Sequence, residues 1–189
     1  MLINSKFNLI LESKDICERN ERAGIIIYTI KNGEIFFLLG IDRRTRELTD
    51  FGGGCKNKQN KESLIDAGWR EFKEESCGIF EDVISKENLY SSIVVTNNNY
   101  DTAIFFVKVD NSWLETAEES FKNAQRILKS LDINTESEEE NIAVKWIHEK
   151  HFKEIAFNRK KQCMWSRIQS FLIKNIESYN ELHNKLIEN

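Results

Sequence analysis

The sequence predicts an α+β fold of one domain, in which a mixed β-sheet is packed between helices. Short runs of β-branched and apolar residues indicate strands, and longer amphipathic segments indicate helices. The two kinds of segment alternate without the regular βαβ rhythm of a parallel sheet, which favours a mixed α-β-α sandwich. The 189 residues suffice for one core. We expect that core over about 22–157 and a helical C-terminal extension over about 158–189.

Two hairpins and one late strand are expected to build the sheet. Asn32 and Gly33 stand between two apolar runs, and an Asn-Gly pair favours the two-residue turns that match the twist of paired strands. A polar turn at 97–100 separates two further apolar runs and predicts the second hairpin. The predicted strands span residues 23–30, 35–41, 89–96, 101–109 and 142–147.

Three segments carry the spacing of amphipathic helices. In residues 61–76, Ile65, Trp69 and Phe72 recur at intervals of four and three. Gly78 follows at a position where a left-handed residue can end a helix. Residues 112–131 and the segment from 158 to about 187 show similar apolar stripes, and the glycines at 52–54 are expected to form a loop before the first helix.

Composition excludes several classes of protein. No apolar run approaches the roughly 18 residues that would span a bilayer, so we expect no membrane partner. The N-terminus lacks the features of a secretory signal, and we expect a cytoplasmic location. The four cysteines form no CxxC pair, which argues against a disulfide framework or a zinc knuckle. A formal net charge of −4 argues against nucleic-acid binding over the whole surface.

One face of the first predicted helix is strongly acidic. At 3.6 residues per turn, Glu71, Glu74 and Glu75 fall within an arc of roughly 100° beside the apolar face. Clustered carboxylates repel one another and favour a neutralising cation, and such hard oxygen ligands suit Mg²⁺ or Mn²⁺. The alternative interpretation is a solvated acidic helix face without a function.

The stretch around this helix resembles the Nudix box of Nudix hydrolases. The box pattern is Gly, five residues, Glu, seven residues, Arg-Glu, an aliphatic residue, any residue, Glu-Glu, any residue, Gly. Here Glu62 precedes Arg70 by seven intervening residues, and residues 70–75 read Arg-Glu-Phe-Lys-Glu-Glu. The sequence departs from the pattern at both ends, because seven residues instead of five separate Gly54 from Glu62, and Cys77 occupies the final glycine position.

The resemblance implies a Nudix fold and a role for each box residue. Glu71, Glu74 and Glu75 would bind Mg²⁺ or Mn²⁺ with a carbonyl of Gly53 or Gly54. Arg70 and Glu62 would orient these carboxylates by charge-assisted hydrogen bonds. Water would then attack a diphosphate linkage in a nucleotide substrate, a nucleoside diphosphate joined to another group. The catalytic set would comprise Glu71, Glu75, Arg70 and Glu62. The general base would be Glu75 or Glu71, or else Glu139 from the acidic loop at 136–140.

Three versions of this function remain open. Phe51 and Tyr100 are candidates for contact with a nucleobase, although strand aromatics more often belong to the core. The basic stretch from Lys150 to Arg167 could bind RNA, which would suit an mRNA-decapping enzyme, or could be a solvated helix face. An enzyme for small nucleotides needs no such surface. A third version is a Nudix-fold module that binds nucleotides for regulation and has lost turnover.

Overall fold

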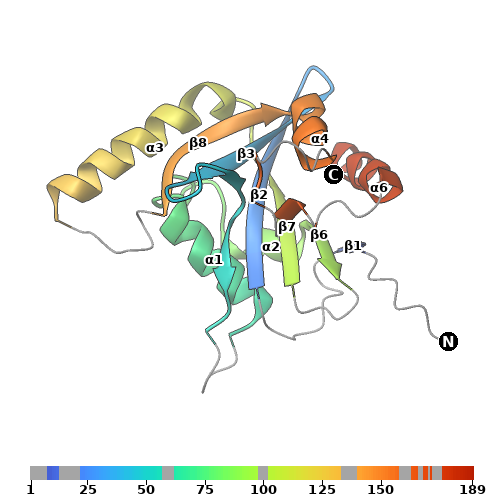
Figure 1. Ribbon diagram of the computed structural model, residues 1–189, viewed down its shortest axis with the longest axis horizontal. Coiled ribbons are helices and arrows are strands. Elements are labelled where there is room, and N and C mark those ends of the chain that lie inside the picture. The colour runs from blue at the N-terminus through green and yellow to red at the C-terminus, as the bar shows by residue number, and fades with distance from the viewer. Residues whose placement is uncertain are drawn as a thin grey trace.

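A computed structural model describes residues 8–12, 22–56, 62–97, 102–132, 140–157, 163–165, 168–169, 171 and 176–189 (Figure 1). The strands of this described part are β1 (Asn8–Glu12), β2 (Arg22–Lys31), β3 (Glu34–Asp42), β4 (Leu48–Thr49), β5 (Phe51–Gly54), β6 (Ile93–Asn97), β7 (Thr102–Lys108) and β8 (Asn141–His148). The helices are α1 (Leu64–Glu75), α2 (Lys86–Tyr90), α3 (Trp113–Ser130), α4 (Glu149–Phe157) and α6 (Ile176–Glu188).

The described strands form one mixed sheet, as the sequence predicts. Its order is β1-β6-β7-β2-β3-β4, with β5 paired to β2 and β8 paired to β3. Strands β2 and β7 run parallel, whereas β2 is antiparallel to both β3 and β5. The long strand β2 therefore has β7 on one edge and shares its other edge between β3 and β5.

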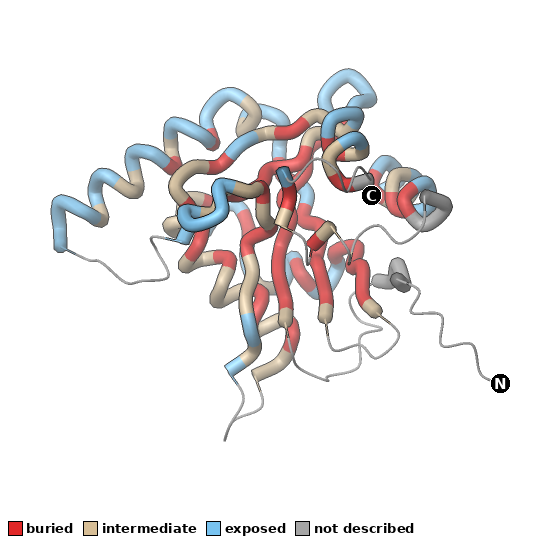
Figure 2. The backbone as a smooth tube through the Cα atoms, in the orientation of Figure 1, coloured by how far each residue is buried: buried red, intermediate tan, exposed pale blue. Residues whose placement is uncertain are grey.

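Helices cover both faces of the sheet, which confirms the α-β-α sandwich. Ile25 and Ile27 of β2 pack into a cluster that includes apolar residues of α1, α2 and α3. Ile26 and Tyr28, the alternate residues of the same strand, pack into a second cluster with α4 and α6. The central strands are accordingly buried almost throughout their length, as the red tube in Figure 2 shows. None of the helices in the described part has the length and apolar content needed to cross a bilayer.

The first hairpin forms as predicted. Asn32 and Gly33 have φ angles of 56° and 80°, the left-handed backbone that an Asn-Gly turn accommodates. Strands β6 and β7 form the second hairpin, but β6 begins at Ile93. The predicted strand at 89–96 is too long at its start, because Leu89 and Tyr90 close the short helix α2.

The glycines before the box helix lie in a strand, so the expected loop there is wrong. Gly52 pairs with Gly24 and Gly53 pairs with Ala23 in the antiparallel contact between β5 and β2. A Cβ at Gly52 would lie 2.3 Å from the Cα of Gly24. The missing side chains thus allow the two backbones to approach closely, and β5 is held rigidly against the central strand.

The box helix α1 has well-defined ends. The side chain of Ser63 accepts the backbone N–H of Asp66 at 3.0 Å and caps the N-terminus. At the C-terminus, Cys77 and Gly78 both have positive φ angles, of 55° and 68°. Their N–H groups donate to the carbonyls of Glu74 and Lys73, which is the bonding of a Schellman cap. A left-handed cap therefore ends the helix as predicted, but Cys77 holds the position directly after the C-cap residue Ser76, and Gly78 is the left-handed residue that follows it.

Helix α4 follows β8 directly and occupies residues 149–157, at the end of the expected core, where the sequence predicts no helix. Helix α6 confirms the helical character of the extension within the described residues. Residues 163–165 pass beside β4, since Leu48 and Met164 form a parallel bridge.

Candidate active site

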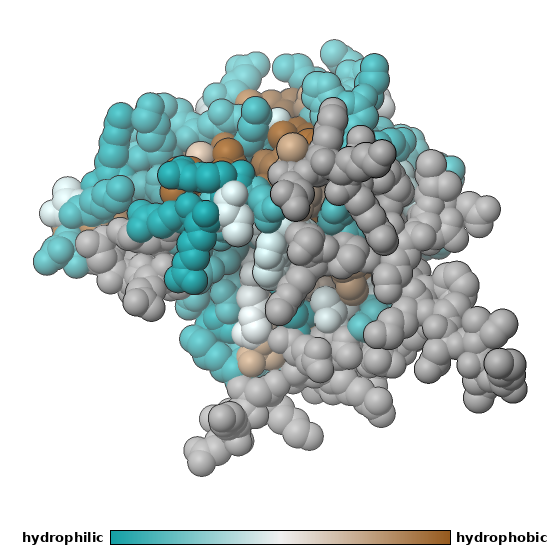
Figure 3. Space-filling view, viewed as in Figure 1, coloured by the Kyte–Doolittle hydropathy of each residue, from teal (hydrophilic) through white to brown (hydrophobic). Residues whose placement is uncertain are grey.

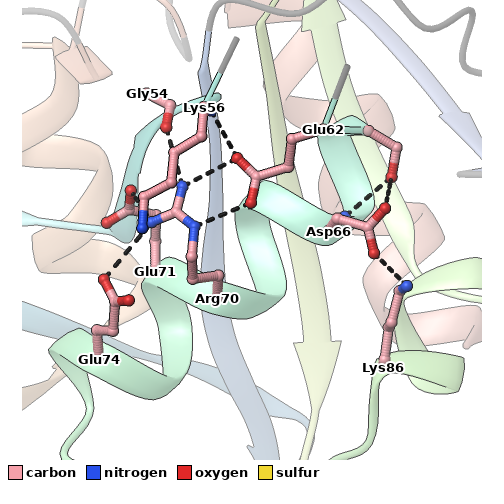
Figure 4. A network of polar contacts seen from close by, with 9 residues as sticks. Gly54, Lys56, Glu62, Asp66, Arg70, Glu71, Glu74 and Lys86 are labelled. Carbon is pink, nitrogen blue, oxygen red and sulfur yellow. Dashed lines mark hydrogen bonds and ion pairs between the residues drawn. The ribbon is translucent and has the colours of Figure 1, made fainter. Parts of the chain in front are cut away.

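Arg70 stands at the centre of the box residues (Figure 4). Its Nε donates to Glu62 Oε1 at 2.9 Å, and its Nη2 donates to Glu62 Oε2 at 3.1 Å. Nη1 donates to Glu71 Oε1 at 2.5 Å and lies 3.5 Å from Glu74 Oε2. Nη2 also donates to the carbonyl of Gly54 at 3.0 Å. One guanidinium therefore joins three box carboxylates to strand β5.

Local structure explains why these side chains meet. Arg70 and Glu74 lie four residues apart on α1 and therefore on the same side of the helix. Glu62 lies just before the cap residue Ser63, and the N–H of Lys56 donates to its Oε2 at 2.6 Å. The hydrogen bond from Arg70 is the main cause that lowers the pKa of Glu62. Glu62 is thus held as an anion between the end of β5 and the start of α1.

The absence of a side chain at Gly53 lets the carboxylate of Glu71 pack directly against β5. A Cβ at Gly53 would lie 2.5 to 2.7 Å from the carboxyl atoms of Glu71, closer than real side chains approach. The Glu71 carboxylate thus fills the space that a side chain at position 53 would take. Burial raises the pKa of Glu71, and the hydrogen bond from Arg70 opposes that rise.

Glu75 is the most enclosed of the box carboxylates, with 5% of its surface exposed. Its Oε2 accepts the backbone N–H of Gly52 at 2.8 Å. Its pKa is raised well above the usual value, first by burial, then by the charge of Asp50 and by a hydrogen bond with Glu140.

Glu140 is the residue of the predicted acidic loop that the structure describes, and it lies close to Glu75. It precedes β8, and its carbonyl accepts the N–H of Arg43 at 2.7 Å, which fixes its backbone. The candidate base predicted from this loop is Glu139, the residue before Glu140. Glu139 lies outside the described residues, as does Tyr100.

A buried ion pair beside Glu75 was not predicted. Arg22 donates to both oxygens of Asp50, at 2.9 and 2.6 Å, and Asp50 is fully buried. Arg22 also donates to the carbonyl of Gly52 at 3.1 Å. The two residues lie 28 positions apart and share no motif, so only the pairing of β2 with β5 reveals their contact.

The oxygen-rich donor set has the chemistry of a site for a hard divalent cation. No three acidic, histidine or cysteine side chains of the described residues are grouped closely enough to hold a metal ion. Instead, Arg70 Nη1 contacts both Glu71 and Glu74, and its positive charge neutralises their carboxylates. The donor types therefore fit Mg²⁺ or Mn²⁺, and binding would require Glu71 and Glu74 to exchange contacts with Arg70 for contacts with the ion.

The expected aromatic contact at Phe51 is wrong. Phe51 is fully buried and packs edge-to-face on Phe72, with ring centroids 5.7 Å apart, so no base can stack on it. The described surface in the view of Figure 3 is predominantly hydrophilic. Of the basic stretch, Lys150 is exposed and Lys153 pairs with Glu149 at 3.3 Å, while residues 158–162 and 166–167 lie outside the described part.

Comparison with known proteins finds similar solved structures but no similar sequence. No protein-family model matches the chain. No curated protein matches it in sequence either. The solved structure of a C. elegans Ap4A hydrolase binary complex superposes with a TM-score of 0.47 at 16% identity, covering 88% of this chain and 99% of that one. A second structure of C. elegans Ap4A hydrolase gives a TM-score of 0.42 at 14% identity, covering 87% and 98%.

Proposed function

We propose that this protein is a hydrolase of the Nudix type that cleaves a diphosphate linkage in a nucleotide substrate with Mg²⁺ or Mn²⁺. The observation that carries the proposal is the fourfold contact of Arg70 with Glu62, Glu71, Glu74 and the Gly54 carbonyl. The spacing of the box in the sequence and this arrangement of side chains single out the same residues. A solvated acidic helix face would not need an arginine that ties it to a glycine strand.

Each residue has a defined task in this proposal. Glu71, Glu74 and Glu75 would hold the cation with a carbonyl of Gly53 or Gly54. A bound divalent ion neutralises phosphate charge and lowers the pKa of the attacking water. Glu62 and Arg70 keep the carboxylates oriented. Glu75 or Glu71 would take up the proton that water releases, because both carboxylates lie against the glycine strand β5 beside the proposed cation position.

A substrate panel tests the proposal. Purified protein with Mg²⁺ or Mn²⁺ is offered NTPs, dNTPs, dinucleoside polyphosphates, nucleotide sugars and capped RNA, and products are identified by mass. We expect cleavage of a diphosphate linkage in at least one member, and none with Glu74→Gln or Glu75→Gln. Release of no product from any member refutes the proposal. For the decapping version, charge reversal at Arg159, Lys160 and Lys161 should slow cleavage of capped RNA but not of free cap analogue.

A Nudix-fold module without turnover is the second candidate. The observation that favours it is the pairing of Glu71 and Glu74 with Arg70, because these carboxylates are not grouped around a position for a metal ion. Such a module would bind nucleotide through the same residues without hydrolysis. Isothermal titration calorimetry that shows nucleotide binding, with no product after prolonged incubation, would favour this candidate over the enzyme.

A further inference from the structure

A buried ion pair of Arg22 and Asp50 lies beside Glu75, and an aromatic ring covers its arginine. Arg22 binds both oxygens of Asp50, and its side chain is 12% exposed. Buried ion pairs contribute little net stability, because desolvation of the charges offsets their attraction. Stability alone therefore does not explain why the chain keeps this pair beside its proposed catalytic carboxylate.

The backbone is shaped to receive Asp50. A Cβ at Gly24 would lie 2.0 Å from Asp50 Oδ2, so the carboxylate occupies the space left by the missing side chain. Gly52 then joins the ion pair to Glu75. Its carbonyl accepts from Arg22 at 3.1 Å, and its N–H donates to Glu75 Oε2 at 2.8 Å. Any shift of Arg22 is therefore passed to the group that holds Glu75.

The C-terminal extension supplies a ring that covers Arg22. Leu48 donates its N–H to the carbonyl of Cys163 at 2.8 Å and accepts the N–H of Trp165 at 2.9 Å. Met164 between them is 2% exposed and anchors this segment in the core. The pairing places the ring of Trp165 over Arg22, with 5.3 Å from the guanidinium carbon to the ring centroid. Such a cation–π contact restricts the planar guanidinium to one orientation.

We infer that Trp165, Arg22 and Asp50 are positioning residues for Glu75, and that the C-terminal extension thereby forms part of the active site. The ring of Trp165 packs over the guanidinium of Arg22, and the ion pair with Asp50 holds Arg22 in that orientation. Arg22 in turn binds the carbonyl of Gly52, so that the N–H of Gly52 points at Glu75. This inference rests on the proposed function for its effect on turnover. Small misplacements of a reacting group are costly, so loosening this chain of contacts should reduce the rate of the chemical step.

Two measurements on the full chain test the inference. The first is kcat and KM for the best substrate of the panel, in Trp165→Ala and Trp165→Phe. The second is amide hydrogen exchange at Gly52, followed by NMR without metal or substrate. For Trp165→Ala we expect kcat to fall about 10-fold with KM little changed, and exchange at Gly52 to be about 10-fold faster. Trp165→Phe keeps an aromatic ring over Arg22, so its kcat and its exchange rate at Gly52 should stay close to the wild-type values.

Leu182→Ala in helix α6 is the control. It removes core packing from the C-terminal extension but leaves residues 163–165 and Arg22 in place, so it should lower the melting temperature while kcat and exchange at Gly52 stay near wild type. Equal losses in Leu182→Ala and Trp165→Ala would overturn the role of the ring. Unchanged exchange at Gly52 in Trp165→Ala would overturn the inference whether or not the protein turns over a substrate. Absence of turnover in the wild type would refute the proposed function alone.

Discussion

Arg70 and Glu62 form a two-point ion pair, with Nε 2.9 Å from Oε1 and Nη2 3.1 Å from Oε2. Because Glu62 takes one edge of the guanidinium, Nη1 is left to face Glu71 and Glu74 on α1. The orientation of Arg70, and not only its charge, therefore organises the acidic face of the helix.

Replacing Arg70 by lysine tests this dependence on orientation. An ammonium group keeps the charge but cannot bind both oxygens of Glu62 and also reach Glu71 and Gly54. We expect Arg70→Lys to lower kcat/KM by about 10- to 100-fold, as for other residues that orient metal ligands. Arg126→Lys on the exposed part of α3 is the control and should leave activity unchanged. Equal activity of the two variants would show that only the charge of Arg70 matters.

Glu75 should make stability depend on pH in a defined direction. Its folded-state pKa is raised above 4.5, so the stability it contributes is complete below that pH and is lost as pH rises through the folded value. Glu75→Gln cannot ionise and escapes this loss. We expect the melting temperatures of the variant and the wild type to agree near pH 4, with the variant increasingly higher toward pH 8, in metal-free buffer.

The exposed Glu154 on α4 supplies the control for this experiment. Glu154→Gln removes one carboxylate from helix α4, away from Glu75, and should follow the wild-type pH profile. A melting temperature of Glu75→Gln that is lower than that of the wild type at pH 8 would contradict the assignment of a buried, costly charge to Glu75.

Gly53 should be essential for the place of Glu71. The added methyl group of Gly53→Ala would lie 2.5 to 2.7 Å from the carboxyl atoms of Glu71 and must displace that carboxylate. We expect activity to fall by about 100-fold, since displacement of a reacting group by about 1 Å has that effect. Gly68→Ala in α1 is the matched control, because its new Cβ meets neighbours only at 3.5 Å or more. It should retain activity and gain about 0.5 to 1 kcal/mol of stability.

Cys77 should tolerate glycine better than a branched residue. Its φ of 55° is the left-handed conformation at the end of α1, which costs a residue with a Cβ about 1 kcal/mol. Cys77→Gly relieves this strain, but it also removes a half-buried side chain and raises the conformational entropy of the unfolded chain. Because these effects oppose one another, we expect the free energy of unfolding to change by less than about 1 kcal/mol. Cys77→Val should lose about 2 kcal/mol in urea unfolding. Equal stability of both variants would show that the cap is not strained.

The features predicted from sequence are those set by local patterns. The turn at Asn32 and Gly33, the apolar stripe of α1 and the cap at Gly78 each depend on residues a few positions apart. The acidic face of α1 follows from helical spacing in the same way. The resemblance of the box identified Glu62 and Arg70 together, and the structure brings them into contact.

The features that the sequence did not predict depend on contacts between distant segments. Three consecutive glycines have low strand propensity, and only pairing with β2 makes Gly52 and Gly53 part of a strand. Phe51 looked available to a substrate because nothing local shows that α1 covers it. Arg22 and Trp165 belong to opposite ends of the chain, and they meet only because residues 163–165 pair beside β4.

Hydrolysis in ¹⁸O-enriched water tests the central claim most directly. The claim is that the carboxylates of α1, ordered by Arg70 and Glu62, promote attack of water on a phosphorus atom of a diphosphate linkage. With Mg²⁺ and the best substrate of the panel, we expect one ¹⁸O atom in a single phosphate-bearing product, and no labelled product with Glu75→Gln. Unlabelled phosphate products from the wild type, or equal labelling by the wild type and Glu75→Gln, would contradict the account.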